Sequence, residues 1–365
     1  MLRPAFVSLL AILSVSGVAN AWFRVACASP LVQERIDPIR NPGQTPSQHT
    51  HTVRLPDPTN PTYDYNNLRA SSCTSCQVAQ DMSNYWYPKL YFHDRKANTF
   101  TAVDNGGLLV YYQNRGTDDA INGGPGLKAS AFPPGFRMTT GNPARRSKKY
   151  AVGEGSQGEL SERAAHWVCL RYGAGNEGRT NGTGFPWTDC ESGLNARLHM
   201  PACWDGVNLY KEDNSHVAYL SEIDNGSCPP GYPVGLMKLL YEVTWNVHEF
   251  AHLWDPNTES WPFVYATGDP TGYSWHGDFQ NGWDTTALQN AIDHCNNPND
   301  QTGNGVTEAC SYLTVNAAAT ANACKIDPIV NEQVNGTLTK LPGCNPLQAG
   351  PADATMYSSS DCPSS

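Results

Sequence analysis

The 365-residue sequence has few charged residues and no basic stripe. Charged residues make up 16% of the chain and the formal net charge is −10, whereas about a quarter of the residues in a typical soluble protein are charged. A protein that binds nucleic acid needs a basic surface, so this composition excludes nucleic acid as an expected partner. The length suffices for one large domain or two ordinary ones.

Long hydrophobic runs are also scarce. The one clear run, "FVSLLAILSVSGV", follows Arg3 and precedes "ANA" at 19–21, the pattern of a secretory signal and its cleavage site. We therefore expect residues 1–21 to be a signal peptide and the protein to be secreted, into the medium or the cell wall. No later run is apolar enough to span a membrane, and the C-terminal "YSSSDCPSS" lacks the hydrophobic tail of a lipid-anchor signal.

A second C-x-x-C pair, which a ribbon-type zinc site needs, is missing as well. Cys73 and Cys76 form the one such pair among twelve cysteines, all of which lie beyond the expected signal. An even number of cysteines in an exported chain predicts disulfide bonds. Three N-glycosylation sequons, at Asn181, Asn225 and Asn335, are consistent with export.

Strand and turn signals dominate the rest of the chain. Runs such as "YWYPKLYFHD" and "GGLLVYYQN" are rich in aromatic and β-branched residues and are bounded by Gly or Asn. Residues 123–165 are predicted to be long surface loops, and the one convincing helix lies near residues 284–295, capped by Asp284 or Thr285. We expect a mainly β protein: a single large sandwich or jelly-roll-like domain with few helices and long disulfide-pinned loops. This domain would span residues 22–295, and residues 296–365 would form a cysteine-containing C-terminal extension.

The stretch "TWNVHEFAHLW" contains His248-Glu249-x-x-His252, the helical motif of zinc peptidases. Apolar and polar residues alternate before His248, which predicts a strand, and Pro256 leaves room for two helical turns at most. The third ligand of the extended motif is missing, because Thr258 stands where that ligand would be. A zinc-peptidase site is therefore the less favoured interpretation of this stretch. The favoured interpretation is the end of a strand followed by an exposed turn.

Several longer stretches occur together in a specific order. They are "RIDPIRNPG", "HTHTV", "LRASSCTSC", "DMSNYWYPKLYF", "FPPGFRM", "CWDGVNLYKEDNSHVAYLS" and "GDPTGYSWHGDFQNGWD". In this order and spacing the chain resembles the secreted fungal family DUF1996, from about Phe23 to Cys295. The resemblance implies an exported fungal protein, and the wall-associated modules of some members imply contact with cell-wall glycan.

Histidines and carboxylates in these stretches are the candidate site. His49 and His51 share one face of an extended chain, and His216, His276 and Asp278 lie in separate loop-like segments. Such side chains can converge into an acid–base site or a metal site. We expect these five residues to share one pocket. If the pocket binds a divalent metal, the ligands would be His49, His51, His216 and His276; if it binds none, Asp278 would orient His276 or act on a glycosidic oxygen. The alternative is that each histidine pins its own loop by hydrogen bonding.

Tryptophans are concentrated between residues 245 and 283. Flat indole rings suit the apolar faces of sugars, and the indole N–H can donate to a hydroxyl group. Trp245 and Trp283 are expected in the core, whereas Trp254, Trp261 and Trp275 lie in loop-like contexts and are predicted to form a sugar-binding surface.

These residues are consistent with two functions. The first is an enzyme that cleaves cell-wall polysaccharide, with Asp278 and Asp269 as its carboxylates and His216 or His276 beside them. His49, His51 and the three loop tryptophans would then bind the substrate. The alternative is a noncatalytic protein that binds wall glycan through the same aromatic and polar side chains.

Overall fold

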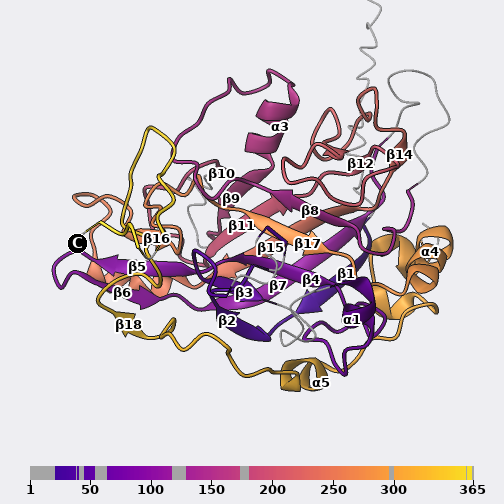
Figure 1. Cartoon of the computed structure of the whole chain (residues 1–365), viewed down its shortest axis with the longest axis horizontal. Helices are drawn as coiled ribbons and strands as arrows, with labels where there is room; N and C mark the ends of the chain where they lie inside the picture. Colours follow the sequence, from indigo (N-terminus) through magenta and orange to yellow (C-terminus); the bar gives the residue numbers. More distant parts are fainter. Residues whose placement is uncertain are drawn as a thin grey trace, which may run out of the picture.

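Two antiparallel sheets that pack face to face form the centre of the protein (Figure 1). This computed structural model describes residues 21–37, 39–40, 45–53, 64–116, 129–172, 181–295, 300–358 and 360–363. Residues 1–20 of the expected signal peptide lie outside the described residues. The mainly β, sandwich-like fold expected from the sequence is confirmed.

The larger sheet has six strands. Their order is β1 (Ala21–Cys27), β7 (Asn105–Gln113), β15 (Lys238–Trp245), β11 (Leu194–His199), β9 (Ala165–Cys169) and β10 (Asn181–Gly182). The facing sheet has five strands, in the order β2 (Val32–Glu34), β3 (His51–Val53), β4 (Asn84–Pro88), β17 (Gly277–Gln280) and β8 (Arg137–Thr140). Every strand pairing in both sheets is antiparallel.

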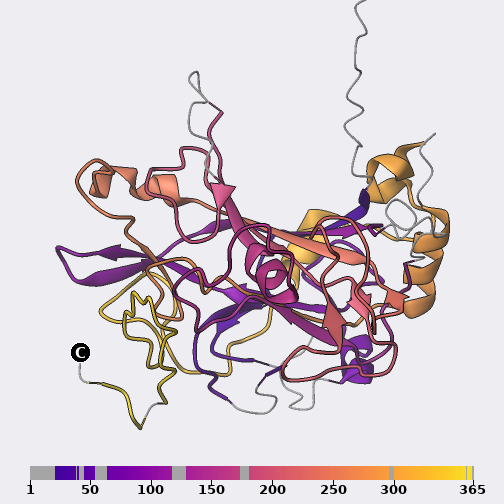
Figure 2. The ribbon, with the colours of Figure 1, turned by 90° about the horizontal axis from the view of Figure 1, so that it is seen from above.

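Two smaller sheets extend this sandwich. One consists of β16 (Phe263–Tyr265), β5 (Leu90–Asp94), β6 (Thr99–Ala102) and β18 (Thr337–Leu338), in that order. The other consists of β13 (Val217–Ala218), β12 (Cys203–Trp204) and β14 (Val234–Gly235). Figure 2 shows the β5–β6 hairpin projecting from the sandwich on the side opposite to α4.

The main core lies between the two large sheets. Tyr85 on β4 and Phe279 on β17 point toward the six-stranded sheet. The ring centroid of Tyr85 lies 5.8 Å from that of Tyr241 on β15. Gly277 allows close approach, because a Cβ at this position would lie 2.6 Å from Leu198 Cδ1. Alternate residues of β4 and β17 therefore point away from this core, toward the opposite face of the five-stranded sheet.

Helices are short and lie outside the sandwich. In the described part of the chain they are α1 (Tyr65–Arg69), α3 (Gln157–Arg163), α4 (Thr285–His294) and α5 (Ala318–Ala323), with 3-10 helices η1 (Val247–Leu253), η2 (Gln301–Asn304) and η3 (Thr307–Ala309). The predicted helix α4 is confirmed, and Asp284 is its cap, because its carboxylate accepts from Ala287 N. Strand β8 and helix α3 correct the prediction of long surface loops over residues 123–165. At the start of α3, Ser156 accepts from Glu159 N, a capping contact hidden within a Gly-rich stretch.

All twelve cysteines are paired, as predicted. The pairs are Cys27–Cys76, Cys73–Cys324, Cys169–Cys190, Cys203–Cys228, Cys295–Cys310 and Cys344–Cys362. Cys73–Cys324 fastens the C-terminal part of the chain to the segment before β4 across 251 residues of sequence. In Figure 1 the yellow end of the chain lies close to β5 and β16.

We expect loss of the Cys73–Cys324 bridge to destabilise the protein more than loss of Cys344–Cys362. The bridges close loops with sequence separations of 251 and 18 residues, and chain entropy assigns them about 5 and about 3 kcal/mol respectively. Paired Cys→Ser variants, compared in urea unfolding, measure the difference. Equal losses of unfolding free energy in the two variants would contradict this ranking.

A buried cation at one end of the six-stranded sheet ties three of its strands together. Lys238 Nζ on β15 donates to Gln113 Oε1 of β7 at 3.1 Å, to His199 Nδ1 of β11 at 2.7 Å and to Asp224 Oδ1 at 2.7 Å. Burial lowers the pKa of Lys238 to about 8. His166 stacks on His199 with ring centroids 5.1 Å apart, and burial lowers the pKa of His166 to about 4.

Acid should therefore destabilise this end of the sheet. In the unfolded chain His166 takes a proton near pH 6.5, whereas in the fold it stays neutral until about pH 4, so folding stability falls as the pH drops between these values. The loss from His166 is about 1–3 kcal/mol. Urea unfolding of wild type, His166→Gln and the exposed-site control His248→Gln between pH 7 and 4 tests this. The pH dependence should weaken in His166→Gln only, and identical slopes in all three proteins would contradict the expectation.

Candidate metal centre

Three histidines reach the outer face of the five-stranded sheet because side chains alternate along its strands. His51 lies on β3, and His49 lies two residues earlier with its ring centroid 4.2 Å from that of His51. His276 directly precedes β17, two residues before Asp278. Strand β4 lies between β3 and β17, and its Pro88 pairs with His51. The H-x-H and H-x-D patterns therefore face each other across one strand.

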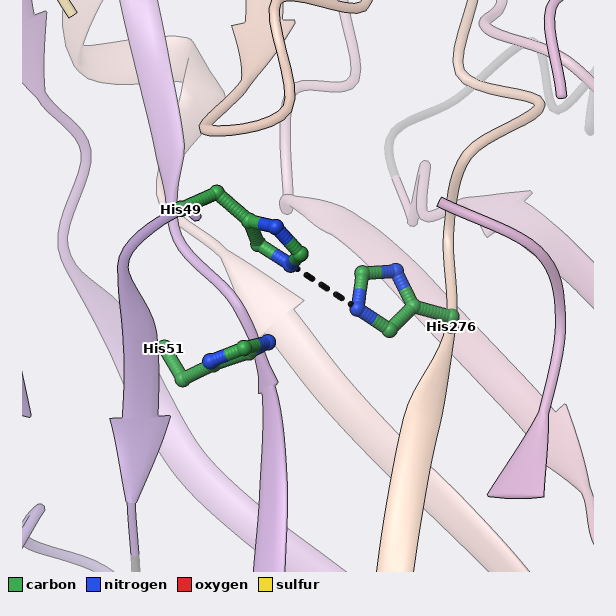
Figure 3. A group of neighbouring side chains, drawn as sticks. All are labelled: His49, His51 and His276. Atoms are coloured by element: carbon green, nitrogen blue, oxygen red, sulfur yellow. Dashed lines mark hydrogen bonds between the residues drawn. The ribbon is translucent and has the colours of Figure 1, made fainter. Parts of the chain in front are cut away.

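The three imidazoles point toward a common centre, as Figure 3 shows. Each offers a ring nitrogen, and these nitrogens all lie within 4.8 Å of one another. The Nε2 atoms of His49 and His276 are 3.1 Å apart. Across the described part of the chain, no other group of three or more His, Cys, Asp or Glu side chains meets this condition.

Backbone carbonyls fix the orientation of two of the rings. His51 Nδ1 lies 2.8 Å from the carbonyl oxygen of Ile36, and His276 Nδ1 lies 2.7 Å from that of Ser274. A carbonyl oxygen only accepts, so each Nδ1 carries the proton and each Nε2 keeps a lone pair. Metal-bound histidines are held by the same second contact, an N–H donated to a carbonyl or carboxylate.

Two buried nitrogens of the cluster, His51 Nε2 and His49 Nδ1, have no hydrogen-bond partner among the described residues. The 3.1 Å between the Nε2 atoms of His49 and His276 fits a hydrogen bond. It is also close to the separation of two ligands on one ion, which is about 3.3 Å for nitrogens 2.0–2.1 Å from tetrahedral zinc. A bound cation would satisfy His51 Nε2 as well, whereas a hydrogen bond between His49 and His276 leaves it unpaired.

Burial keeps the three imidazoles neutral. Desolvation, followed by the neighbouring rings of the cluster, holds the pKa of His49 well below its usual range. Burial also lowers the pKa of His51, and it lowers that of His276 to about 3. Neutral imidazole is the form that binds metal ions, so these rings need not lose a proton at neutral pH.

The cluster borders a cavity of about 230 Å³ whose other walls are largely polar. Asp37 and Arg40 face it from one turn, and Glu212 and Asp278 face it from two other segments. Asp37 accepts from the backbone N–H groups of Ile39 and Arg40, which shapes the turn after β2. The side chain of Arg40 donates to Thr139 on β8 at 3.0 Å, so the turn is anchored to the sheet edge.

Asp278 contributes a carboxyl group to the same cavity. It is 2% exposed, and burial together with the charge of Asp37 raises its pKa to about 8, against the opposing effect of Arg40. In this structure the group is therefore mainly a protonated acid at neutral pH. A buried carboxylic acid next to three imidazoles can both donate and accept a proton.

His216 does not join the cluster, which corrects the prediction that it shares the pocket. Its Nε2 lies 2.7 Å from the carbonyl oxygen of Arg137 on β8, and its ring packs near those of Phe136 and Tyr210. The chain reaches it through Asn214, which has a positive φ of 60° and donates through its side chain to the carbonyl oxygen of Thr139 at 2.8 Å. His216 therefore fits the alternative interpretation, in which a histidine holds its own loop by hydrogen bonding.

Asp269 is likewise separate from the three histidines and does not line their cavity. Its carboxylate accepts from Thr271 N, Thr271 Oγ1 and Ser274 N, and it lies 3.7 Å from the buried guanidinium of Arg146. These contacts use both carboxylate oxygens to hold a turn. The prediction that Asp269 and Asp278 are the two carboxylates of one site is therefore wrong, because the two side chains do not line the same cavity.

The three loop tryptophans are buried rather than displayed. Trp254 and Trp261 are 6% exposed and Trp275 is 3% exposed, so they form no sugar-binding surface. Trp254 and Trp261 pack against each other with ring centroids 5.7 Å apart, and Trp275 stacks on Tyr265. Their surroundings looked loop-like because short strands and turns carry them. Trp245 and Trp283 lie in the core as predicted.

The H-E-x-x-H stretch lies in η1, directly after β15 as the alternation predicted. In a 3-10 helix, residues four apart point about 120° apart, so His248 and His252 do not share a face. Both side chains are exposed, and His248 lies 2.6 Å from the carboxylate of Asp189. This geometry does not form the zinc site of a peptidase.

Two of the three sequon asparagines are accessible on the surface. Asn225 and Asn335 are exposed, and Asn225 accepts from Gly116 N through its side chain. Asn181 lies in β10, and its side chain falls outside the described residues.

Sequence reasoning missed several cavity residues. Asp37 and Arg40 lie in the quoted "RIDPIRNPG" stretch, whose pairing of acidic and basic residues was a usable signal. Gln48 and Met356 also line the cavity, and Met356 comes from the polar C-terminal extension. Nothing in the sequence around Met356 connects it with the histidines.

The fold and this site define a disulfide-rich β-sandwich with a three-histidine centre on the outer face of one sheet. The chain belongs to the family described as a domain of unknown function (DUF1996), whose model matches residues 37–283. The match includes His49, His51, His276 and Asp278. Neither the curated proteins nor the solved structures gave a match to this chain.

The disulfide bonds bear on the location of the protein. Six disulfides connect all the cysteines, which is compatible with an extracellular protein. Within the described ranges, no helix has both the length and the apolar character needed to cross a bilayer.

Proposed function

We propose that this is a secreted fungal protein that binds a divalent metal ion through His49, His51 and His276 and uses it to cleave cell-wall polysaccharide. One observation carries the proposal: three neutral, buried imidazoles converge on one point beside a cavity of about 230 Å³. Two of them already donate their other N–H to a carbonyl oxygen, as metal ligands do.

The energetics favour a cation over a self-contained hydrogen-bond network. His51 Nε2 and His49 Nδ1 are buried and find no partner in the described part of the chain, and each such group destabilises a fold by about 1–3 kcal/mol. Bulky apolar side chains would fill the same space without that cost. A metal ion would convert the lone pair of His51 Nε2 into a ligand bond, together with those of His49 Nε2 and His276 Nε2, which gives three buried histidines on one sheet face a physical reason.

Three histidine ligands leave an open coordination position. A divalent ion held by these ligands would act as a Lewis acid and would lower the pKa of a water molecule bound to it, so that this water could attack at neutral pH. Asp278, two residues from His276, faces the same cavity and is placed to exchange a proton with a reacting group. In hydrolysis of a glycosidic bond, water oxygen bonds to the anomeric carbon, the carbon–oxygen bond to the leaving sugar breaks, and that oxygen takes a proton.

The cavity limits what can react. Its volume of about 230 Å³ is smaller than the roughly 300–1,000 Å³ of most small-molecule pockets, so it accepts one sugar unit or less. Carboxylate, guanidinium and amide groups of Asp37, Arg40, Glu212 and Gln48 line it, and these groups hydrogen-bond well to hydroxyls. This favours a chain end or a side group of a polysaccharide as the reacting part.

A noncatalytic wall-glycan binder is the second candidate, and surface aromatics favour it. Trp187 is 70% exposed and Tyr172 is 65% exposed, as sugar-contacting rings often are. Pull-down by insoluble wall glycan that is lost in Trp187→Ala, with no product released by the wild type, would support this candidate over the enzyme.

Metal binding is the first test. Protein stripped with a chelator should take up one divalent ion per chain, measured by mass spectrometry of the metal. At one hundred times the dissociation constant the ion should stabilise the fold by about 2.7 kcal/mol. His51→Ala and His276→Ala should lose the ion, whereas the exposed pair His248→Ala, His252→Ala should keep it. Retention of the ion in both cluster variants would contradict the proposal.

Activity is the second test. The metal-loaded protein should release reducing ends from at least one fungal wall polysaccharide, and Asp278→Asn should reduce the rate by about 10²–10⁴-fold, the usual contribution of a positioned acid or base. Asp213→Asn, at an exposed turn, is the matched control and should keep full activity. An unchanged rate in Asp278→Asn would remove this residue from the chemistry.

A further inference from the structure

The C-terminal extension supplies one more side chain to the histidine cavity. Met356 lines it together with the three histidines, although more than three hundred residues separate Met356 from His49 in sequence. The side chain is 37% exposed, so its removal from water does not explain its position.

Hydrogen bonds hold the backbone on both sides of Met356. The side chain of Gln348 accepts from Thr355 N at 2.9 Å and donates to the carbonyl oxygen of Thr355 at 3.0 Å. On the other side, Gln48 Nε2 donates to the carbonyl oxygen of Tyr357 at 3.4 Å. Gln48 is the residue next to His49, so this contact links the Met356 segment directly to the cluster.

The same segment, residues 345–358, is anchored to the sandwich. Arg146, which is fully buried, donates through Nε to the carbonyl oxygen of Gln348 at 2.8 Å, and Gln348 N donates to the carbonyl oxygen of Gly268 at 3.0 Å. The Cys344–Cys362 disulfide closes the segment into a loop. Met356 is therefore presented at the cavity by a constrained segment.

The donors that face this cavity distinguish between metal ions. Asp37, Glu212 and Asp278 also line the cavity, but no carboxylate belongs to the group of mutually close ligand atoms that the three imidazoles form in the described chain. No cysteine thiolate is available, because every cysteine is in a disulfide. The hard ions Mg²⁺, Ca²⁺ and Mn²⁺ prefer oxygen ligands, whereas imidazole nitrogen and thioether sulfur suit copper.

We propose that the ion held by His49, His51 and His276 is copper, and that the thioether of Met356 is its additional, weaker ligand. This inference rests on the metal centre of the proposed function and specifies its metal. Copper(II) binds nitrogen sites most tightly among the divalent first-row ions, and a thioether stabilises copper(I) in particular. The sulfur thus makes the preference of the site for copper over zinc stronger than three imidazoles alone would make it.

The test compares metals and one isosteric variant. Stripped wild-type protein is given copper and zinc ions together, and its bound metals are counted. Its copper(I) affinity is measured by competition with a colorimetric copper(I) chelator. Met356→Leu keeps the size of the side chain and removes the sulfur, and Met82→Leu, at a partly buried methionine outside the cavity, is the matched control.

The expected result is one copper per wild-type chain in the mixture and about a tenfold loss of copper(I) affinity in Met356→Leu, with zinc affinity unchanged in both methionine variants. X-ray absorption should detect a copper–sulfur contact in the wild type and in Met82→Leu but not in Met356→Leu. Zinc in place of copper, or equal copper(I) affinities and no sulfur contact, would overturn the inference while leaving the metal-dependent function standing. Absence of any bound metal would overturn both.

Discussion

The alternation of side chains along β4 and β17 is the constraint on which both the core and the site depend. On one face Tyr85 and Phe279 enter the packed interior between the two large sheets. On the other face, His276 and Asp278 meet the residues presented by β3. A shift of one residue in the pairing of β17 with β4 would exchange these two faces. The register that buries the aromatic core therefore also assembles the histidine cluster.

Burial then determines the chemistry of that cluster. Because water is excluded, the pKa values of the three histidines are lowered and the rings stay neutral. The carbonyl groups of Ile36 and Ser274 select which nitrogen of two of the rings faces inward. The outcome is a preorganised set of lone pairs, and such preorganisation reduces the reorganisation that a ligand must bring about when it binds. The C-terminal extension completes the cavity, which gives its disulfide and its buried Arg146 contact a role beside stability.

Sequence patterns predicted part of this arrangement. Period-two alternation before His248 predicted β15, the capped amphipathic run predicted α4, and the even cysteine count predicted full pairing. The sequence predicted that His49 and His51 lie in one pocket with His276 and Asp278, and the structure brings these four residues together. His216 could not be separated from them, because its position depends on how the Asn214 turn packs against β8. The exposure of Trp254 and Trp261 could not be judged either, since burial of a loop-like segment is decided by tertiary packing.

The most direct test of the account is the anomalous X-ray scattering of crystals grown from copper-loaded protein, recorded on both sides of the copper absorption edge. The account predicts one anomalous peak per chain, within ligand-bond distance of ring nitrogens of His49, His51 and His276. A fully loaded crystal with no peak among these three histidines, or with the metal bound at His248 and His252 instead, would contradict it.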